Sequence, residues 1–174
     1  MKLLISLILT LMSLFASNAI AGWDPNAEDD ARKTIVAFKK ADPKLDRFFA
    51  KAYGYAVYPT VGKGGMGIGG AYGSGTVFQQ GKVIGSSRLT QLTIGFQFGG
   101  QAYSEIIFFK DKAALERFKK GNFELSAQAS AVAVTAGASA DIDYSSGVAV
   151  FTMAKGGLMY EASVGGQVLS FEAK

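Results

Sequence analysis

Two side-chain types that carry much of enzyme chemistry are absent from this chain. Its 174 residues include no histidine and no cysteine. A nucleophilic serine or cysteine is usually activated by a histidine, and protein zinc sites are built mainly from cysteine and histidine. The sequence therefore excludes Ser-His-Asp and Cys-His sites, and most zinc sites. Because no other acid–base or nucleophile arrangement stands out, we expect a protein that is not an enzyme and uses no cofactor.

Asp141 and Asp143 are the best acidic pair, with one residue between them. Alternate residues of a β-strand share a face, so two such carboxylates can hold a hard cation together. A cation of this kind prefers six or more oxygen ligands, which the pair does not supply. We favour the alternative, a solvated loop before Ser145, and predict no metal site; whether a cation visits the pair stays open.

The segment Gly62-Lys63-Gly64-Gly65-Met66-Gly67 matches the dinucleotide-binding pattern GxGxxG. That motif requires a helix directly behind the glycine loop, which presents its N-terminus to the pyrophosphate. Residues 68–72 resemble a strand instead, and the pair Gly69-Gly70 disfavours a helix. We therefore interpret these glycines as backbone devices for turns, bulges or close packing.

The densest basic cluster lies between residues 33 and 51. A basic amphipathic helix can lie on an anionic bilayer, but each basic residue near the surface contributes only about 1 kcal/mol. Asp42 and Asp46 also lower the net positive charge of this stretch. On the residues alone, we favour lysines that are merely solvated while the apolar helix faces pack on a sheet. The candidate lipid-binding residues are Lys33, Lys39, Lys40, Lys44, Arg47 and Lys51.

Three helices are predicted to support these sites. Asp24-Pro25 begins the first helix, and Asp42-Pro43 ends it and begins the second, for which Gly54 is a plausible C-terminal cap. A third helix runs from Asp111, its N-terminal cap, to Lys120. The first helix carries an apolar stripe at helical spacing, formed by Ala27, Ala31, Ile35 and Phe38.

The sequence changes to a period of two after Tyr55, which is typical of strands. The clearest alternation runs from Thr90 to Phe98, and Gln80-Gly81 is a good hairpin turn. Residues 126–140 carry almost only small side chains and predict a closely packed strand or strand pair. The fold class is therefore α+β, a strongly curved or barrel-like antiparallel β-sheet with two N-terminal helices and one inserted helix. The remaining predicted strands are 56–61, 67–72, 76–79, 82–86, 102–109, 147–153, 158–164 and 167–172.

The N-terminus has the pattern of a secretory leader. Lys2 precedes an apolar run, and Ala19-Ile20-Ala21 predicts cleavage before Gly22, so that residues 1–21 are a signal peptide and 22–174 a single domain. The alternative, a retained anchor, needs about 20 apolar residues. The absence of cysteine excludes a lipoprotein, and we expect a periplasmic or secreted protein. The formal net charge of +4 is too small and dispersed to indicate nucleic acid.

Several motifs resemble the SYLF domain family, in order along the mature chain. The opening motif is Tyr53-Gly54-Tyr55-Ala56-Val57-Tyr58-Pro59, and the last is Tyr160-Glu161-Ala162-Ser163-Val164-Gly165-Gly166-Gln167. The resemblance implies lipid binding; eukaryotic members bind phosphoinositide membranes, and some bind actin. The other motifs that carry the resemblance are residues 61–65, 69–73, 99–107 and 129–131.

An exported member meets neither actin nor, ordinarily, phosphoinositides. The resemblance therefore predicts an exported, non-enzymatic lipid- or membrane-surface-binding domain of the cell envelope. Its expected partner is an anionic phospholipid or other envelope lipid, and actin is not expected. One alternative is a structural or interaction module that recognises an envelope protein. A small outer-membrane β-barrel is disfavoured, because several strands are short, a helix interrupts them and the chain ends in Glu172-Ala173-Lys174.

Overall fold

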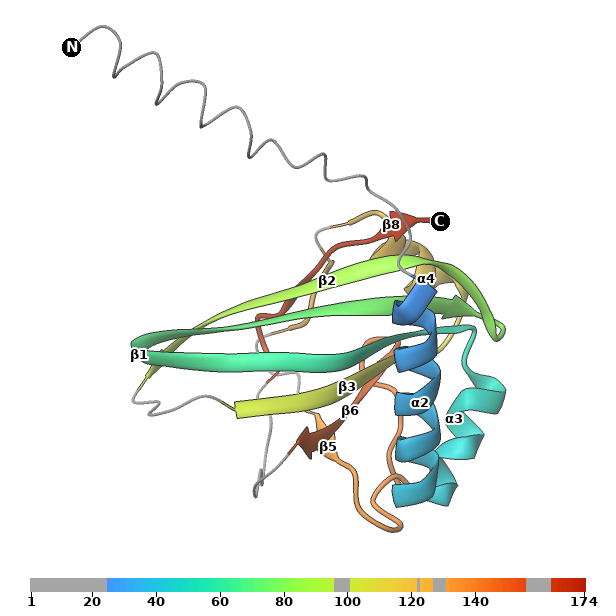
Figure 1. The fold of residues 1–174 in the computed structure, drawn as a ribbon. Helices are drawn as coiled ribbons and strands as arrows, with labels where there is room; N and C mark the ends of the chain where they lie inside the picture. The colour runs from blue at the N-terminus through green and yellow to red at the C-terminus, as the bar shows by residue number, and fades with distance from the viewer. Residues whose placement is uncertain (1–24, 96–100, 122, 127–130, 156–163) are drawn as a thin grey trace, which may run out of the picture.

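A strongly curled sheet with helices on both faces forms the body of the molecule (Figure 1). The computed structural model describes residues 25–95, 101–121, 123–126, 131–155 and 164–174. The predicted leader, 1–21, lies outside the described residues. Within those ranges, no helix has the length and apolar character needed to cross a membrane. The helices are α2 (Pro25–Ala41), the 3-10 turn η2 (Pro43–Leu45), α3 (Asp46–Lys51) and α4 (Lys112–Lys119).

The sheet contains eight strands in the order β4-β7-β2-β1-β3-β6-β5, and β8 also pairs with β2. The predicted α+β class and curved sheet are confirmed, but the sheet is mixed, because β5 runs parallel to β6. Residues 134–147 carry the chain back from the end of β5 to the start of β6, which makes those two strands parallel. The strands are β1 (Gly54–Gln79), β2 (Lys82–Gly95), β3 (Gln101–Phe109), β4 (Phe123–Glu124), β5 (Val132–Ala133), β6 (Val148–Lys155), β7 (Val168–Leu169) and β8 (Glu172–Ala173).

The long strand β1 doubles back on itself, and Figure 1 shows its turn at the left-hand tip of the sheet. Its first half pairs with β3 and its second half pairs with β2. Gly75 lies where the halves touch, since a Cβ there would be 2.6 Å from Cδ1 of Tyr58. The GxGxxG segment thus lies within a strand with no helix behind it, which rules out the dinucleotide-binding geometry.

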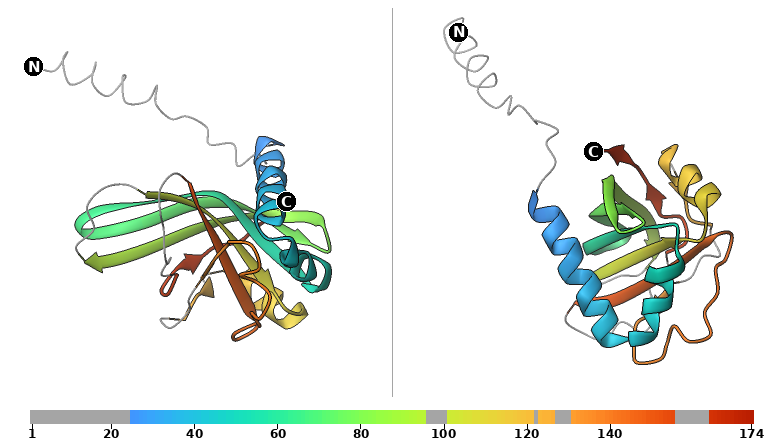
Figure 2. Two further views of the ribbon diagram at one scale, coloured as in Figure 1. Left: turned by 90° about the horizontal axis from the view of Figure 1, so that it is seen from below. Right: turned by 90° about the vertical axis from the view of Figure 1, so that its right-hand side faces the viewer.

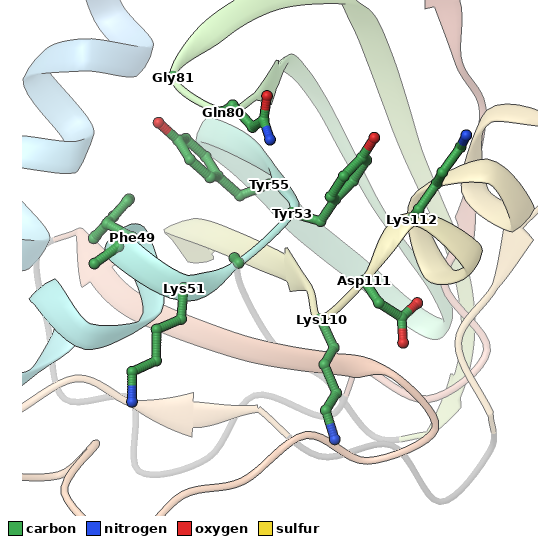
Figure 3. A pocket seen from close by; sticks show the side chains of 11 residues that line it. Phe49, Lys51, Tyr53, Tyr55, Gln80, Gly81, Lys110, Asp111 and Lys112 are labelled. Atoms are coloured by element: carbon green, nitrogen blue, oxygen red, sulfur yellow. The ribbon is translucent and has the colours of Figure 1, made fainter.

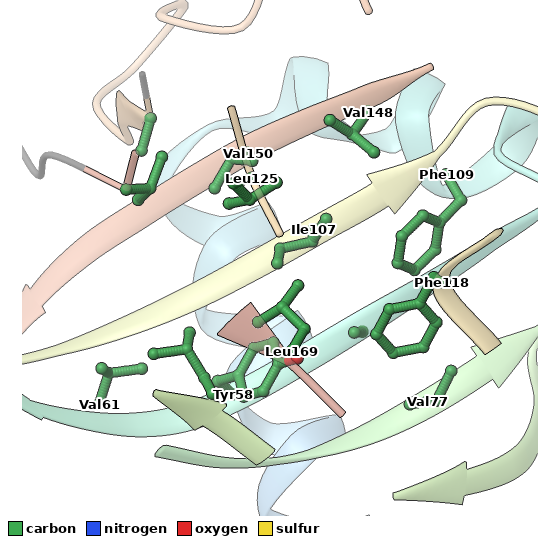
Figure 4. Packing of buried hydrophobic residues seen from close by; sticks show 14 of the residues in the cluster. Tyr58, Val61, Val77, Ile107, Phe109, Phe118, Leu125, Val148, Val150 and Leu169 are labelled. Carbon is green, nitrogen blue, oxygen red and sulfur yellow. The ribbon is translucent and has the colours of Figure 1, made fainter. Parts of the chain in front are cut away.

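Each face of the sheet has its own hydrophobic core. Helices α2 and α3 cover one face, where Phe38 and Phe48 pack with Phe108. Helix α4 and the C-terminal strands lie on the concave face, where Ile107 and Phe109 point (Figures 2 and 4). Neighbouring residues of β3 therefore serve opposite cores, which explains why residues 103–109 are all buried.

Predicted caps and turns are largely confirmed. The Asp111 carboxylate accepts from the Ala114 amide at 2.8 Å and caps α4. Gln80 and Gly81 have φ values of 49° and 78°, as a tight hairpin requires. The prediction for Gly54 was wrong, because it begins β1 instead of capping α3. A Cβ at Gly54 would lie 2.8 Å from the Phe78 carbonyl oxygen, so the glycine permits a close approach of backbones.

The prediction of a strand or strand pair over residues 126–140 was wrong for most of the residues that the structure describes. Of residues 126–140, β5 is only Val132–Ala133, and 134–140 form turns; 127–130 lie outside the described residues. Turns form here because the Asp42 carboxylate accepts hydrogen bonds from the backbone amides of Gly137 and Ser139. Those amides are then not available for pairing with a neighbouring strand. The predicted strand 167–172 is divided into β7 and β8, and parts of two others, 96–98 and 158–163, lie outside the described residues.

Candidate functional site

Three of the six predicted basic residues are exposed and available to a ligand. Lys40 is at the end of α2, Lys44 in η2 and Lys51 at the end of α3. All three are exposed, and none forms an ion pair with a residue that the structure describes. Their elements are consecutive in the chain and lie at one end of the sheet (Figure 1). We call these three residues the helical lysines.

Two other predicted lysines are already paired. The Nζ atom of Lys33 lies 3.4 Å from a carboxylate oxygen of Asp29 and 3.5 Å from one of Asp30. Asp29, and then Asp30, raise the pKa of Lys33, so it stays charged while its charge is balanced locally. Lys39 lies 2.7 Å from Asp46 and above the ring of Phe49. A ligand would compete with these contacts for both ammonium groups.

Arg47 uses one of its guanidinium nitrogens, Nη2, for hydrogen bonds to the protein's own backbone. Its Nη2 donates to the carbonyl oxygens of Ser139, at 2.6 Å, and of Ile142. Its guanidinium also lies 4.8 Å from the centre of the Phe48 ring. Arg47 therefore ties α3 to the loop before β6. The structure thus gives it a structural role, whereas the helical lysines extend toward solvent.

A basic pocket beside Lys51 adds two lysines that sequence reasoning missed (Figure 3). The cavity has a volume of about 610 Å³ and lies where α3, the β1–β2 hairpin and the start of α4 meet. Lys110 and Lys112 line it together with Lys51, and Figure 3 shows Lys51 and Lys110 extending to the same side. No local pattern predicts this meeting, because it joins positions about sixty residues apart. The aromatic lining residues are Phe49, Tyr53 and Tyr55.

Backbone hydrogen bonds hold the walls of this pocket in place. The amide of Tyr53 donates to the Phe109 carbonyl at 3.0 Å, and that of Gln80 donates to the Tyr53 carbonyl at 3.3 Å. These bonds fix the end of α3 beside the end of β3 and the hairpin. Burial raises the pKa of Tyr55, against the lowering effect of Arg32, so its phenol is neutral. The pocket therefore combines aromatic walls held by backbone hydrogen bonds with exposed lysine side chains.

The charged side chains that line this pocket would suit an anion. The pocket's one carboxylate, Asp111, is directed at the Ala114 amide as the cap of α4. Lysine ammonium groups bind phosphate or carboxylate oxygens as point charges, and a partly enclosed site strengthens such contacts. The arrangement suits a phosphate-bearing head group.

The acidic pair does not form the arrangement that a cation needs. Asp141 and Asp143 lie in a loop and not on a strand, so the basis for a shared face is absent. Both are exposed, and Asp143 accepts from the backbone amide of Tyr144. Across the described ranges, no group of three or more histidine, cysteine or acidic residues could hold a metal ion.

Comparisons with known proteins identify two similarities. Residues 90–174 match the family model Ysc84, described as Las17-binding protein actin regulator. The chain is also 26% identical over 145 residues to Beta cell expansion factor A of Aeromonas veronii. That alignment covers 78% of the chain and 52% of the relative, so the chain spans about half the length of this curated relative.

Proposed function

We propose that this chain, whose residues 90–174 match the Ysc84 (SYLF) family model, is an exported, non-enzymatic domain that binds anionic lipid at a membrane surface of the cell envelope. The supporting observation is the basic end of the molecule. There Lys51 lines the pocket together with Lys110 and Lys112, and Lys40 and Lys44 lie on the two elements that precede α3 in the chain.

The charges at this end support a weak attraction to an anionic surface. A basic residue near an anionic membrane contributes about 1 kcal/mol, so the helical lysines supply about 3 kcal/mol before the pocket is filled. An apolar contact is also available, since Val36 on α2 is 65% exposed. Val36 precedes Lys40 by four positions, which puts an apolar side chain and a cation on one side of the helix. This combination is typical of helices that lie in the membrane interface.

A direct test is co-sedimentation of residues 22–174 with vesicles. In low salt, the protein should sediment with vesicles that contain phosphatidylglycerol and remain in solution with purely zwitterionic vesicles. Replacing the helical lysines by glutamate (Lys40→Glu, Lys44→Glu, Lys51→Glu) removes about 3 kcal/mol of attraction and should weaken binding more than a hundredfold.

The matched control makes the same change of charge elsewhere. Lys63, Arg88 and Lys155 belong to β1, β2 and β6, outside the basic end, and their replacement by glutamate should have a much smaller effect. Equal losses in the two triple variants would show that only net charge matters. Unchanged binding after reversal of the helical lysines would exclude them as the membrane contact.

A protein partner is the second candidate function, and a sheet face favours it. Leu92 is 87% exposed and Tyr72 is 56% exposed. Gly70 pairs with Leu92, and Tyr72 pairs with Thr90, so the two large side chains share one face of β1 and β2. Retention of an envelope protein that Leu92→Ser abolishes, with no affinity for vesicles, would favour this function over lipid binding.

A further inference from the structure

A carboxyl group is buried inside the curled sheet, away from the basic end. Glu105 on β3 is 0% exposed. Its Oε2 atom accepts from the side-chain amide of Gln167 at 3.1 Å, and Oε1 has no partner among the described residues. Burial raises the pKa of Glu105 to about 8, although the Gln167 bond lowers it in part. At neutral pH the side chain is therefore mainly an uncharged acid that can donate a hydrogen bond.

The groups around Glu105 are polar but carry no balancing cation. Tyr58 of β1 is paired directly with it, and Tyr58 bonds to Ser87 of β2 at 2.6 Å. Burial also raises the pKa of Tyr58 and of Tyr103, its neighbour on β3, so both face it as neutral phenols. In the described part of the chain, no lysine or arginine forms an ion pair with Glu105.

Two buried oxygens near Glu105 lack a donor. Thr152 of β6 is paired with Glu105, and its Oγ1 atom is buried without a hydrogen-bond partner. The Oε1 atom of Gln167 is in the same situation, whereas its Nε2 donates to Glu105 and to the Tyr103 hydroxyl. An ionised Glu105 would add an uncompensated charge among these buried groups, whereas the neutral acid adds none. Its complete burial and the lack of a balancing cation among the described residues therefore favour the neutral acid.

Gln167 belongs to the segment that covers the concave interior. Residues 164–173 are joined to the sheet by two short strands, β7 and β8, each with two residue pairs on β2. Val164 and Leu169 are fully buried in the concave core, and the Gln167 carbonyl accepts from the Leu125 amide at 2.9 Å. We call residues 164–173 the C-terminal strap. Gln167 is its polar link to the interior.

We propose that Glu105 acts as a pH-dependent latch for the C-terminal strap, which stays closed over the concave face while Glu105 is protonated. Gln167 can donate to Glu105 in either protonation state, but ionisation buries a charge that no cation balances, and this destabilises the closed strap. In an opened strap the carboxyl returns toward its ordinary pKa of 4.5. The closed form holds the proton more tightly. The free energy that favours closure is therefore greatest below pH 4.5 and falls as the pH rises to about 8. Over this window the opening constant should rise about tenfold per pH unit.

Hydrogen exchange of the full mature protein between pH 5 and 9 tests the latch. After correction for the intrinsic pH dependence of exchange, amides of the C-terminal strap should open about a hundredfold more often at pH 7.5 than at pH 5.5. Amides of α2 should not show this change. Glu105→Gln keeps the shape and hydrogen-bonding capacity without an ionisable group, and it should remove the dependence. Glu124→Gln is the matched control, since Glu124 is exposed on β4, and it should retain the dependence.

The outcomes separate clearly. The same pH profile in wild type and Glu105→Gln would overturn the latch. An equal change in α2 would also overturn it, because opening would then be global. If Glu105→Gln does not fold, the carboxyl carbon resonance of Glu105 in the wild type decides: titration near pH 8 supports the latch, and complete ionisation at pH 6 refutes it. Vesicle binding enters none of these measurements, so the latch and the proposed function can fail independently.

Discussion

Replacing Asp42 by alanine should destabilise this protein far more than loss of an exposed carboxylate. The side chain is 0% exposed and accepts three backbone amides. Its Oδ1 atom accepts from Lys44 at 3.1 Å and Gly137 at 3.2 Å, and Oδ2 accepts from Ser139 at 2.8 Å. One carboxylate therefore begins η2 and also holds a loop almost a hundred residues later in the chain.

The expected cost follows from these three bonds. A hydrogen bond to a charged group contributes about 1.5–3 kcal/mol, but the Lys44 amide lies at an exposed helix start where water can replace the carboxylate. The two loop amides lose a buried partner and are the larger loss. We expect Asp42→Ala to lower the free energy of unfolding by about 3–5 kcal/mol, a large part of the stability of an ordinary domain.

The same bonds give a pH signature. Burial alone would raise the pKa of Asp42, but the amides of Ser139, Lys44 and Gly137 together hold it below its ordinary value of 3.8. The ionised Asp42 therefore stabilises the folded protein above pH 3.8. This stabilisation is lost as the pH falls through the lower pKa that Asp42 has in the folded state. Asp42→Asn should therefore flatten the acid side of the stability curve.

Urea denaturation followed by circular dichroism measures both effects at a series of pH values. Asp141→Ala is the control, because Asp141 is exposed in the loop before Asp143, and it should change the free energy of unfolding by less than about 0.5 kcal/mol. A loss below about 1 kcal/mol for Asp42→Ala would refute the reasoning, since the loop amides would then have found other partners at little cost.

Two further substitutions probe the packing. Gly85→Ala places a Cβ against the Glu172 carbonyl oxygen and should cost about 1–3 kcal/mol or detach β8. Gly62→Ala, with nothing within 4 Å, should be nearly neutral, and thermal unfolding compares the two variants. Arg47→Lys retains the charge but removes the planar guanidinium, whose Nη2 donates to two loop carbonyls, and it should cost about 1–2 kcal/mol in urea denaturation. An unchanged midpoint would contradict the structural role of Arg47.

Local signals in the sequence predicted the N-terminal caps at Asp42 and Asp111, the hairpin and the fold class. The cap at Asp111 depends only on neighbouring residues, and the Gln80-Gly81 turn depends on two backbone conformations. The curled sheet follows from many short strands separated by glycines. The family motifs also served as a guide, although the family match begins at residue 90 and the opening motif at Tyr53 precedes it.

Features that depend on distant contacts were missed. The sequence shows that Lys51 and Lys110 are basic, but it does not show that they line one pocket, because backbone pairing between α3, β3 and a hairpin brings them there. Glu105 looks like an ordinary polar position of a strand. Only helices and strands on both faces of β3 make it a buried acid. Small residues after position 130 suggested strands, yet Asp42 binds their amides and favours turns.

The distribution of charge argues that the proposed attachment to a membrane would be weak, reversible and dependent on salt. The chain has a net charge of only +4, and two of its predicted membrane cations, Lys33 and Lys39, are balanced by neighbouring carboxylates. About 1 kcal/mol from each helical lysine amounts to millimolar affinity at best, so stronger binding requires the pocket, Val36 or several copies on one surface. The Debye screening length falls to about 3 Å at 1 M salt. The electrostatic part of the binding energy should therefore vanish at that salt concentration, while any apolar contact survives. Binding that persists undiminished at 1 M salt would therefore assign the membrane contact to apolar side chains and leave the lysines a secondary role.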